Sequence, residues 1–196
     1  MKKFFLVLLI LTVVGGAAFA DLLAYPPSLE GKNILIDAGI GLAYTGFISS
    51  SSAKMSIPPL FVQVEFCLPT KVPISVGGMF GIFQYKWEWD GYDWWSGNYK
   101  AVKYTEKYTT SFFAIRGNWH WNFSPEWLDF YTGVNMGYRY VKWSIDPDRS
   151  NYSDPGWSAF SVGLQVGAHF YFTKVFGLMA EVGFPYWIKG GIALKF

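Results

Sequence analysis

The last eight residues, Lys189-Gly190-Gly191-Ile192-Ala193-Leu194-Lys195-Phe196, decide the fold of this chain. Ile192, Leu194 and Phe196 stand at every second position, and the two lysines fall on the opposite face. A period of two belongs to a β-strand whose two faces meet different surroundings. Where those surroundings are hydrocarbon and a polar lumen, only a closed barrel satisfies the backbone hydrogen bonds of the sheet. The stretch therefore predicts a membrane-spanning β-barrel.

The N-terminal residues read as an export signal. Lys2 and Lys3 precede an apolar run over 4–14, and Ala18-Phe19-Ala20 has the small-x-small pattern of a cleavage site. We predict a signal peptide over 1–20, a periplasmic N-terminal lead over 21–32 and a barrel over 33–196.

Composition excludes several classes of protein. Without Lys2 and Lys3, 14 basic residues face 14 acidic ones, which gives no support to a nucleic-acid partner. Apolar residues make up 52% of the chain, yet no run after residue 20 approaches the roughly 18 residues of a spanning helix. The 21 glycines also disfavour helices, at about 1 kcal/mol each relative to alanine.

Eight segments alternate between apolar and polar or small residues, and eight strands form the smallest usual barrel. The predicted strands cover 33–42, 60–68, 74–83, 110–123, 128–140, 160–172, 175–184 and 186–196. The fold class we predict is all-β, an eight-stranded antiparallel up-and-down transmembrane β-barrel.

The segment 110–123 shows the alternation most clearly. Phe113, Ile115 and Trp119 alternate with Arg116 and Asn118. A soluble lipocalin-like barrel would bury the apolar face and expose the charges. It would then crowd several tryptophans and phenylalanines into its interior, so we prefer the membrane barrel.

The connections alternate in length, as they do in bacterial barrels. Short turns at 69–73, 124–127 and 173–174 are expected on the periplasmic side. Longer outer loops are expected at 43–59, 84–109 and 141–159, with a tight turn around Pro185.

Three stretches resemble a known group of barrels: PISVGGMFGIFQY (73–85), LDFYTGVNMGYRY (128–140) and GAHFYFTKVFGLMAEVGFPYWIKGGIALKF (167–196). They are similar to the small opacity-type barrels and to the outer-membrane protein X and W families, and the resemblance covers nearly all of 33–196. It implies a location in the bacterial outer membrane, among families that include adhesins and narrow channels. The last strand resembles the insertion signal read by the barrel-assembly machinery, with Gly191, Leu194 and Phe196 as its marks.

The inward positions carry as many acids as bases. The predicted polar network of the lumen contains Asp37, Glu65, Arg116, Arg139, Glu181 and Lys189, joined by Asp129, Lys195, Gln63, Asn118, His120, Asn135, Gln165 and His169. The interior of an eight-stranded barrel is just wide enough for side chains to fill it, and buried charges are stable only when paired. We expect a salt-bridged plug; a solute path along the axis is the alternative.

Glu181 and Lys189 lie four residues on either side of Pro185. A hairpin centred on Pro185 places the two side chains opposite each other inside the barrel. Such a pair would fix the register, because a one-residue slip would turn both charges into lipid.

No catalytic or metal-binding pattern emerges. His120 and His169 lack a serine two residues on, and each is expected to be a neutral histidine bonded to a carboxylate or amide. Asp146, Asp148 and Asn151 suggest a calcium loop, but its glycine and glutamate are missing. We expect no enzyme activity, no cofactor and no metal.

The second outer loop is unusually aromatic, with nine rings between Tyr85 and Tyr108. Aromatics mixed with charges suit recognition, and the candidates for contact with a ligand or partner are Trp87, Trp89, Trp94 and Trp95. Alternatively, the rings belong to the aromatic girdle or form cross-strand pairs where two strands continue above the membrane.

Two functions stay open. The first is a structural or surface-interaction, adhesin-like barrel with a largely plugged lumen, whose partners are outer-membrane lipid, the assembly machinery and a host or matrix ligand. The second is a narrow channel for small or apolar solutes.

Overall fold

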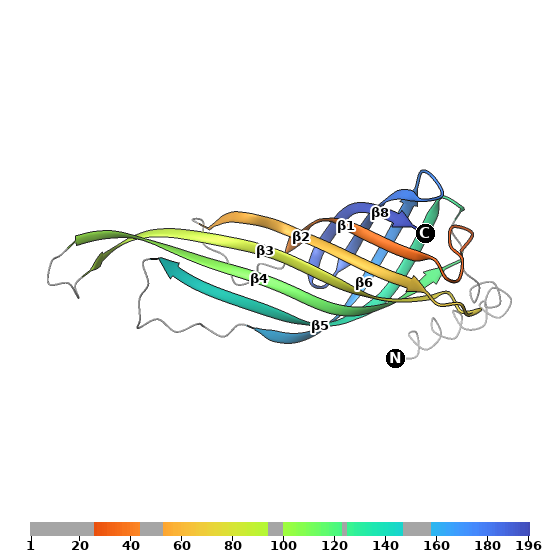
Figure 1. Cartoon of the computed structure of the whole chain (residues 1–196), viewed down its shortest axis with the longest axis horizontal. Helices are drawn as coiled ribbons and strands as arrows, with labels where there is room; N and C mark the ends of the chain where they lie inside the picture. The colour runs from red at the N-terminus through yellow and green to blue at the C-terminus, as the bar shows by residue number, and fades with distance from the viewer. Residues whose placement is uncertain (1–25, 44–52, 94–99, 123–124, 147–157) are drawn as a thin grey trace, which may run out of the picture.

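The computed structural model describes residues 26–43, 53–93, 100–122, 125–146 and 158–196. They form eight strands (Figure 1): β1 (Ile34–Ala43), β2 (Lys54–Cys67), β3 (Ile74–Asp93), β4 (Lys100–Trp121), β5 (Leu128–Asp146), β6 (Ala159–Tyr171), β7 (Phe176–Gly183) and β8 (Tyr186–Lys195). Each strand pairs antiparallel with the next, and β1 pairs with β8 to close the barrel. The predicted fold class is confirmed. In the described part of the chain, no helix is long and apolar enough to cross a membrane.

The two faces of the wall differ as the alternation predicts. On β6, Val162, Leu164 and Val166 point outward and are 45–73% exposed, whereas Gln165 and His169 between and beside them are buried. The apolar residues therefore form the outer surface and the polar residues fill the interior. A lipocalin-like barrel would have the opposite arrangement.

Three strands are much longer than predicted. β3 continues to Asp93, β4 begins at Lys100 and β5 continues to Asp146, so most of the predicted outer loop over 84–109 is a β-hairpin. Beyond the ends of their neighbours, β3, β4 and β5 project from the barrel as a three-stranded sheet (Figure 1). β2 also begins earlier than predicted, at Lys54, and its pairing with β3 is irregular around Pro58 and Pro59. A proline there fits because it cannot donate to the ladder.

Residues 26–32 close the end of the barrel at which the C-terminal residue Phe196 lies. Leu29 is buried against Leu35, Cys67 and Tyr171, and the Ser28 hydroxyl donates to the Leu128 carbonyl oxygen at 3.1 Å. This part of the predicted periplasmic lead is thus packed into the barrel end. The predicted signal peptide and residues 21–25 lie outside the described residues.

The interior is layered along the strands. On β4, the buried polar side chains His120, Asn118 and Arg116 are followed by Ala114 and Phe112 towards the outer end. Phe112 belongs to an apolar cluster that also contains Phe61, Met79, Met179, Tyr186 and Ala193. The polar band therefore lies between this outer cluster and the apolar residues at the inner end.

Candidate functional site

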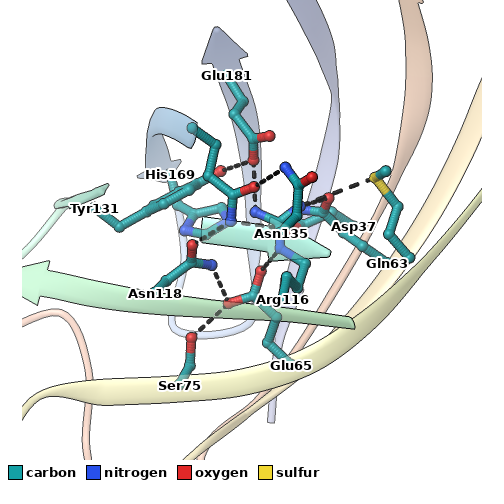
Figure 2. Close-up of polar contacts among 12 residues, drawn as sticks. Asp37, Gln63, Glu65, Ser75, Arg116, Asn118, Tyr131, Asn135, His169 and Glu181 are labelled. Carbon is teal, nitrogen blue, oxygen red and sulfur yellow. Dashed lines mark hydrogen bonds and ion pairs between the residues drawn. The ribbon is translucent and has the colours of Figure 1, made fainter. Parts of the chain in front are cut away.

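Arg116 occupies the centre of the polar band (Figure 2). Its Nε lies 2.8 Å from Glu65 Oε1, and its Nη2 lies 2.6 Å from Glu181 Oε2. Nη1 donates to Gln63 Oε1 at 2.5 Å. One guanidinium thus connects strands β2, β4 and β7 across the lumen, as its planar fork of donors allows.

Glu181 and Lys189 face each other across the β7–β8 hairpin. They are register partners, and Lys189 Nζ lies 2.9 Å from Glu181 Oε1. Lys189 also donates to Gln63 Oε1 at 2.7 Å, and the Tyr131 hydroxyl donates to Glu181 Oε2 at 2.8 Å. The structure therefore joins the hairpin pair to the Arg116 cluster.

His169 is charged rather than neutral. His169 Nδ1 lies 2.8 Å from Asp129 Oδ2, and its Nε2 lies 3.1 Å from Asp37 Oδ2. Because an ionised carboxylate only accepts hydrogen bonds, both ring nitrogens must donate, and the ring is an imidazolium. The expectation of a neutral histidine at this position was wrong, since it assumed a single carboxylate or amide partner.

Ser75, His120 and Asp129 are brought into the order of a catalytic triad. His120 Nδ1 is 2.9 Å from Asp129 Oδ1, and its Nε2 is 2.9 Å from Ser75 Oγ. The Ser75 hydroxyl, however, donates a hydrogen bond to Glu65 Oε2 at 2.5 Å. It must then accept a hydrogen bond from His120, the reverse of what a serine nucleophile requires. Ser75 and His120 are fully buried, so the arrangement is structural.

Two predicted members of the network lie outside these contacts. Lys195 is at the inner end, where its Nζ donates to the Ser28 carbonyl oxygen at 2.6 Å and lies over the Tyr171 ring. Arg139 is on the inner face of β5, opposite Phe112 in the outer apolar cluster. In the central band, His169, not these two residues, joins Arg116 and Lys189 as a partner of the buried acids.

A chain of amides completes the band. Asn135 Nδ2 donates to Gln165 Oε1 at 2.7 Å, and Gln165 Nε2 donates to Asn118 Oδ1 at 2.5 Å. Asn118 in turn donates to Glu65 Oε2 at 2.7 Å. Within the described residues, no group of His, Cys, Asp and Glu is arranged to hold a metal; Asp148 and Asn151 lie outside them.

Two of the four predicted contact tryptophans lie on the projecting sheet. Trp89 stacks on Tyr104 with ring centroids 4.5 Å apart, and Trp87 meets Tyr108 edge-on at 4.9 Å. Both tryptophans are partly exposed. Trp94 and Trp95 lie outside the described residues.

The predicted insertion signal lies at the seam where the barrel closes. The backbones of Phe196 and Ile34 exchange two hydrogen bonds, and the Phe196 side chain is exposed on the outer wall. Leu194 faces outward opposite Phe176. At Gly191, a Cβ would collide with the Ala38 carbonyl oxygen, so this close approach requires glycine.

A closed eight-stranded up-and-down barrel with an apolar outer wall and a polar interior defines the class of integral outer-membrane β-barrels. No protein-family model and no curated protein sequence matches the chain. Its structure is similar to that of the outer membrane protein OprG from Pseudomonas aeruginosa, with a TM-score of 0.50, 10% identity and coverage of 87% of this chain and 99% of OprG.

It is also similar to Ail, the attachment invasion locus protein of Yersinia pestis, solved in complex with the heparin analogue sucrose octasulfate, with a TM-score of 0.45, 13% identity and coverage of 86% of this chain and 100% of Ail. At these identities the likeness is one of fold. The predicted resemblance to small outer-membrane barrels is confirmed at that level, and the protein is placed in the bacterial outer membrane.

Proposed function

We propose that this barrel works at the cell surface through its projecting sheet, as a surface-interaction or adhesin-like protein, and that its lumen carries no solute. The observation that carries the proposal is the paired interior. Arg116, Glu65, Glu181 and Lys189 are at most 4% exposed and form ion pairs of 2.6–2.9 Å across the lumen.

The cost of opening a path supports a sealed lumen. A solute on the axis would have to separate buried ion pairs, and removing one partner of such a pair costs about 3–5 kcal/mol. It would also have to displace the outer apolar cluster, in which Phe112 meets Phe184 edge-on at 5.8 Å. The alternative of a narrow channel for small or apolar solutes has no comparable support among the described residues.

The projecting sheet supports the surface role. β4 pairs with β3 as far as Lys100 and with β5 as far as Thr105, well beyond Ala43 at the end of β1 (Figure 1). Strands needed only to span the bilayer are about 9–11 residues long. The additional length holds aromatic and charged side chains away from the membrane, where a partner can reach them.

The first test measures conduction. Purified protein in planar bilayers and in liposomes should give no ionic current and no solute flux, while its heat-modifiable mobility on gels shows that it is folded and inserted. Steady single-channel currents from folded protein would contradict the sealed lumen and favour the narrow channel.

The second test removes the projecting hairpin. Residues 86–107 are replaced by Asn-Gly, which joins the register partners Tyr85 and Tyr108 by a tight turn. The trimmed barrel should still fold, but bacteria carrying it should attach less well to matrix-coated plates than bacteria with equal amounts of the intact protein. Equal attachment would count against the surface role.

A further inference from the structure

The inner face of the projecting sheet, the side that continues the lumen, carries six aromatic side chains around one acid. Trp87, Trp89, Tyr108 and Trp143 are partly exposed, whereas Tyr85 and Tyr104 are buried. Glu106 on β4 pairs with Trp87 on β3 and Ile145 on β5, and Tyr108 pairs with Tyr85 and Trp143. Directly opposed side chains on one face lie about 4.5–5.5 Å apart at Cβ. We call Tyr85, Trp87, Trp89, Tyr104, Glu106, Tyr108 and Trp143 the aromatic face.

Neutral donors hold the Glu106 carboxylate in place. Trp89 Nε1 donates to Oε1 at 2.8 Å. The Tyr108 hydroxyl and Trp143 Nε1 both approach Oε2 at 3.4 Å. These contacts fix the position of the carboxylate among the rings but leave its negative charge uncompensated.

Glu88, an acid on the opposite face of the same hairpin, has its own cations. Glu88 lies 2.6 Å from Lys86 Nζ and 2.8 Å from Lys103 Nζ. These two lysines lower the pKa of Glu88 to about 2. In the described part of the chain, no lysine, arginine or histidine forms an ion pair with Glu106.

The nearest inner-face cation on β5 is also remote. Arg139 is six residues along the strand from Ile145, the partner of Glu106. At about 3.4 Å per residue the separation is roughly 20 Å. An electron-rich surface with one unneutralised carboxylate is therefore complementary to a positively charged ligand.

We propose that the aromatic face binds a quaternary ammonium group, which would be the chemical feature that this protein recognises at the cell surface. The inference rests on the surface role proposed above. Aromatic rings attract such cations through their π-faces, and aromatic cages are the usual sites for them. Glu106 contributes charge rather than hydrogen bonds, because donors already approach both of its oxygens, and a quaternary ammonium has no N–H to offer. A hard metal ion would need several oxygen ligands, and the aromatic face supplies one carboxylate.

The test compares choline with its neutral isostere 3,3-dimethylbutan-1-ol by isothermal titration calorimetry. The full protein is held in maltoside micelles, because choline-headgroup detergents would compete. Choline should bind saturably and at least about tenfold more tightly than the isostere, a difference of about 1.4 kcal/mol. Equal binding of the two compounds, or no saturable binding of choline, would overturn the proposal without requiring any variant to fold.

Matched substitutions on the two faces locate the site. Glu106→Gln should weaken choline binding about tenfold, and Trp87→Ala should weaken it as well. Glu88→Gln, the same change on the opposite face of the hairpin, should leave it unchanged. Unchanged binding in Glu106→Gln would place the ammonium elsewhere. A failure of choline to bind would not contradict the surface role. That role is tested separately, by the attachment of bacteria that carry the trimmed barrel.

Discussion

Arg116 determines whether the interior charges are stable. Its side chain is buried and contacts Glu65, Glu181 and Gln63, which come from two other strands. In such an interior, the attraction between opposite charges offsets the cost of desolvation only when the geometry and the hydrogen bonding are good. Losing one partner leaves the other charges uncompensated. The guanidinium is suited to this position because it donates in three directions at once.

Replacing Arg116 should therefore be among the most damaging single changes in the lumen. Arg116→Met keeps much of the side-chain volume but leaves Glu65 and Glu181 without their shared cation, so we expect a loss of about 3–5 kcal/mol in the free energy of unfolding. Arg116→Lys should lie between Met and wild type. Urea unfolding in liposomes measures both, with the exposed Lys103→Met as control. A midpoint for Arg116→Met equal to that of the control would contradict the central role of the arginine.

Individual residues of the site were predictable only where the alternation along a strand decides whether a side chain points into the lumen or out of it. Parity turns Asp37, Glu65, Arg116 and Glu181 inward, and hairpin geometry sets Glu181 opposite Lys189. Contacts across the lumen, such as His169 with Asp37, join strands that are not register neighbours and depend on barrel closure. Ser75 was not predicted, because a serine partner was expected two residues after a histidine in the sequence; its inward position on β3 was the available signal.

At the level of elements, the barrel strands were predicted directly, whereas the projecting hairpin was given only as the alternative in which two strands continue above the membrane with their aromatic rings in cross-strand pairs. Within the membrane, lipid on one side and a polar lumen on the other impose a clear period of two. Beyond it, charged residues such as Lys86 and Glu88 were interpreted as a loop. The alternation of Tyr85, Trp87 and Trp89 with these charges was nevertheless the pattern of a strand with one aromatic and one charged face.

A substitution at an outward-facing position on β6 tests whether the outer face of the barrel wall contacts hydrocarbon. Val166 lies mid-strand on the outer surface and pairs with Thr132 and Val182, so Val166→Arg should cost about 2–4 kcal/mol. Glu126→Arg, in the exposed turn before β5, should change stability by less than about 0.5 kcal/mol. Urea titration in liposomes compares the two. Similar midpoints would show that Val166 does not face hydrocarbon.

The whole molecule is closed by one seam, where the last strand meets the first. β8 pairs with β1 along nearly its full length, and Phe196 continues that ladder through its backbone. The side chain of Phe196 is exposed on the outer wall and adds nothing to the interior. Its contribution is therefore expected during assembly rather than in the finished barrel.

Phe196→Asp separates these two stages. In cells, the heat-modifiable fraction in the outer membrane should fall, because the terminal strand no longer presents an apolar residue to the assembly machinery. Refolding of the purified variant into detergent should be largely retained, because the backbone ladder with Ile34 can still form. Normal membrane levels of the variant would rule out an insertion signal at this residue.

The unbroken strand β4 also gives the protein a mechanical property. It runs from His120 in the polar band to Lys100 at the far end of the projecting sheet, and its register with β3 and β5 contains no bulge. Tension applied at the aromatic face is directed along the strands. Ladder hydrogen bonds are perpendicular to the strands, so they are loaded together in shear instead of opening one at a time. Force on an attached cell would thus be transmitted through β4 to the ion pairs of Arg116, which anchor the sheet inside the barrel.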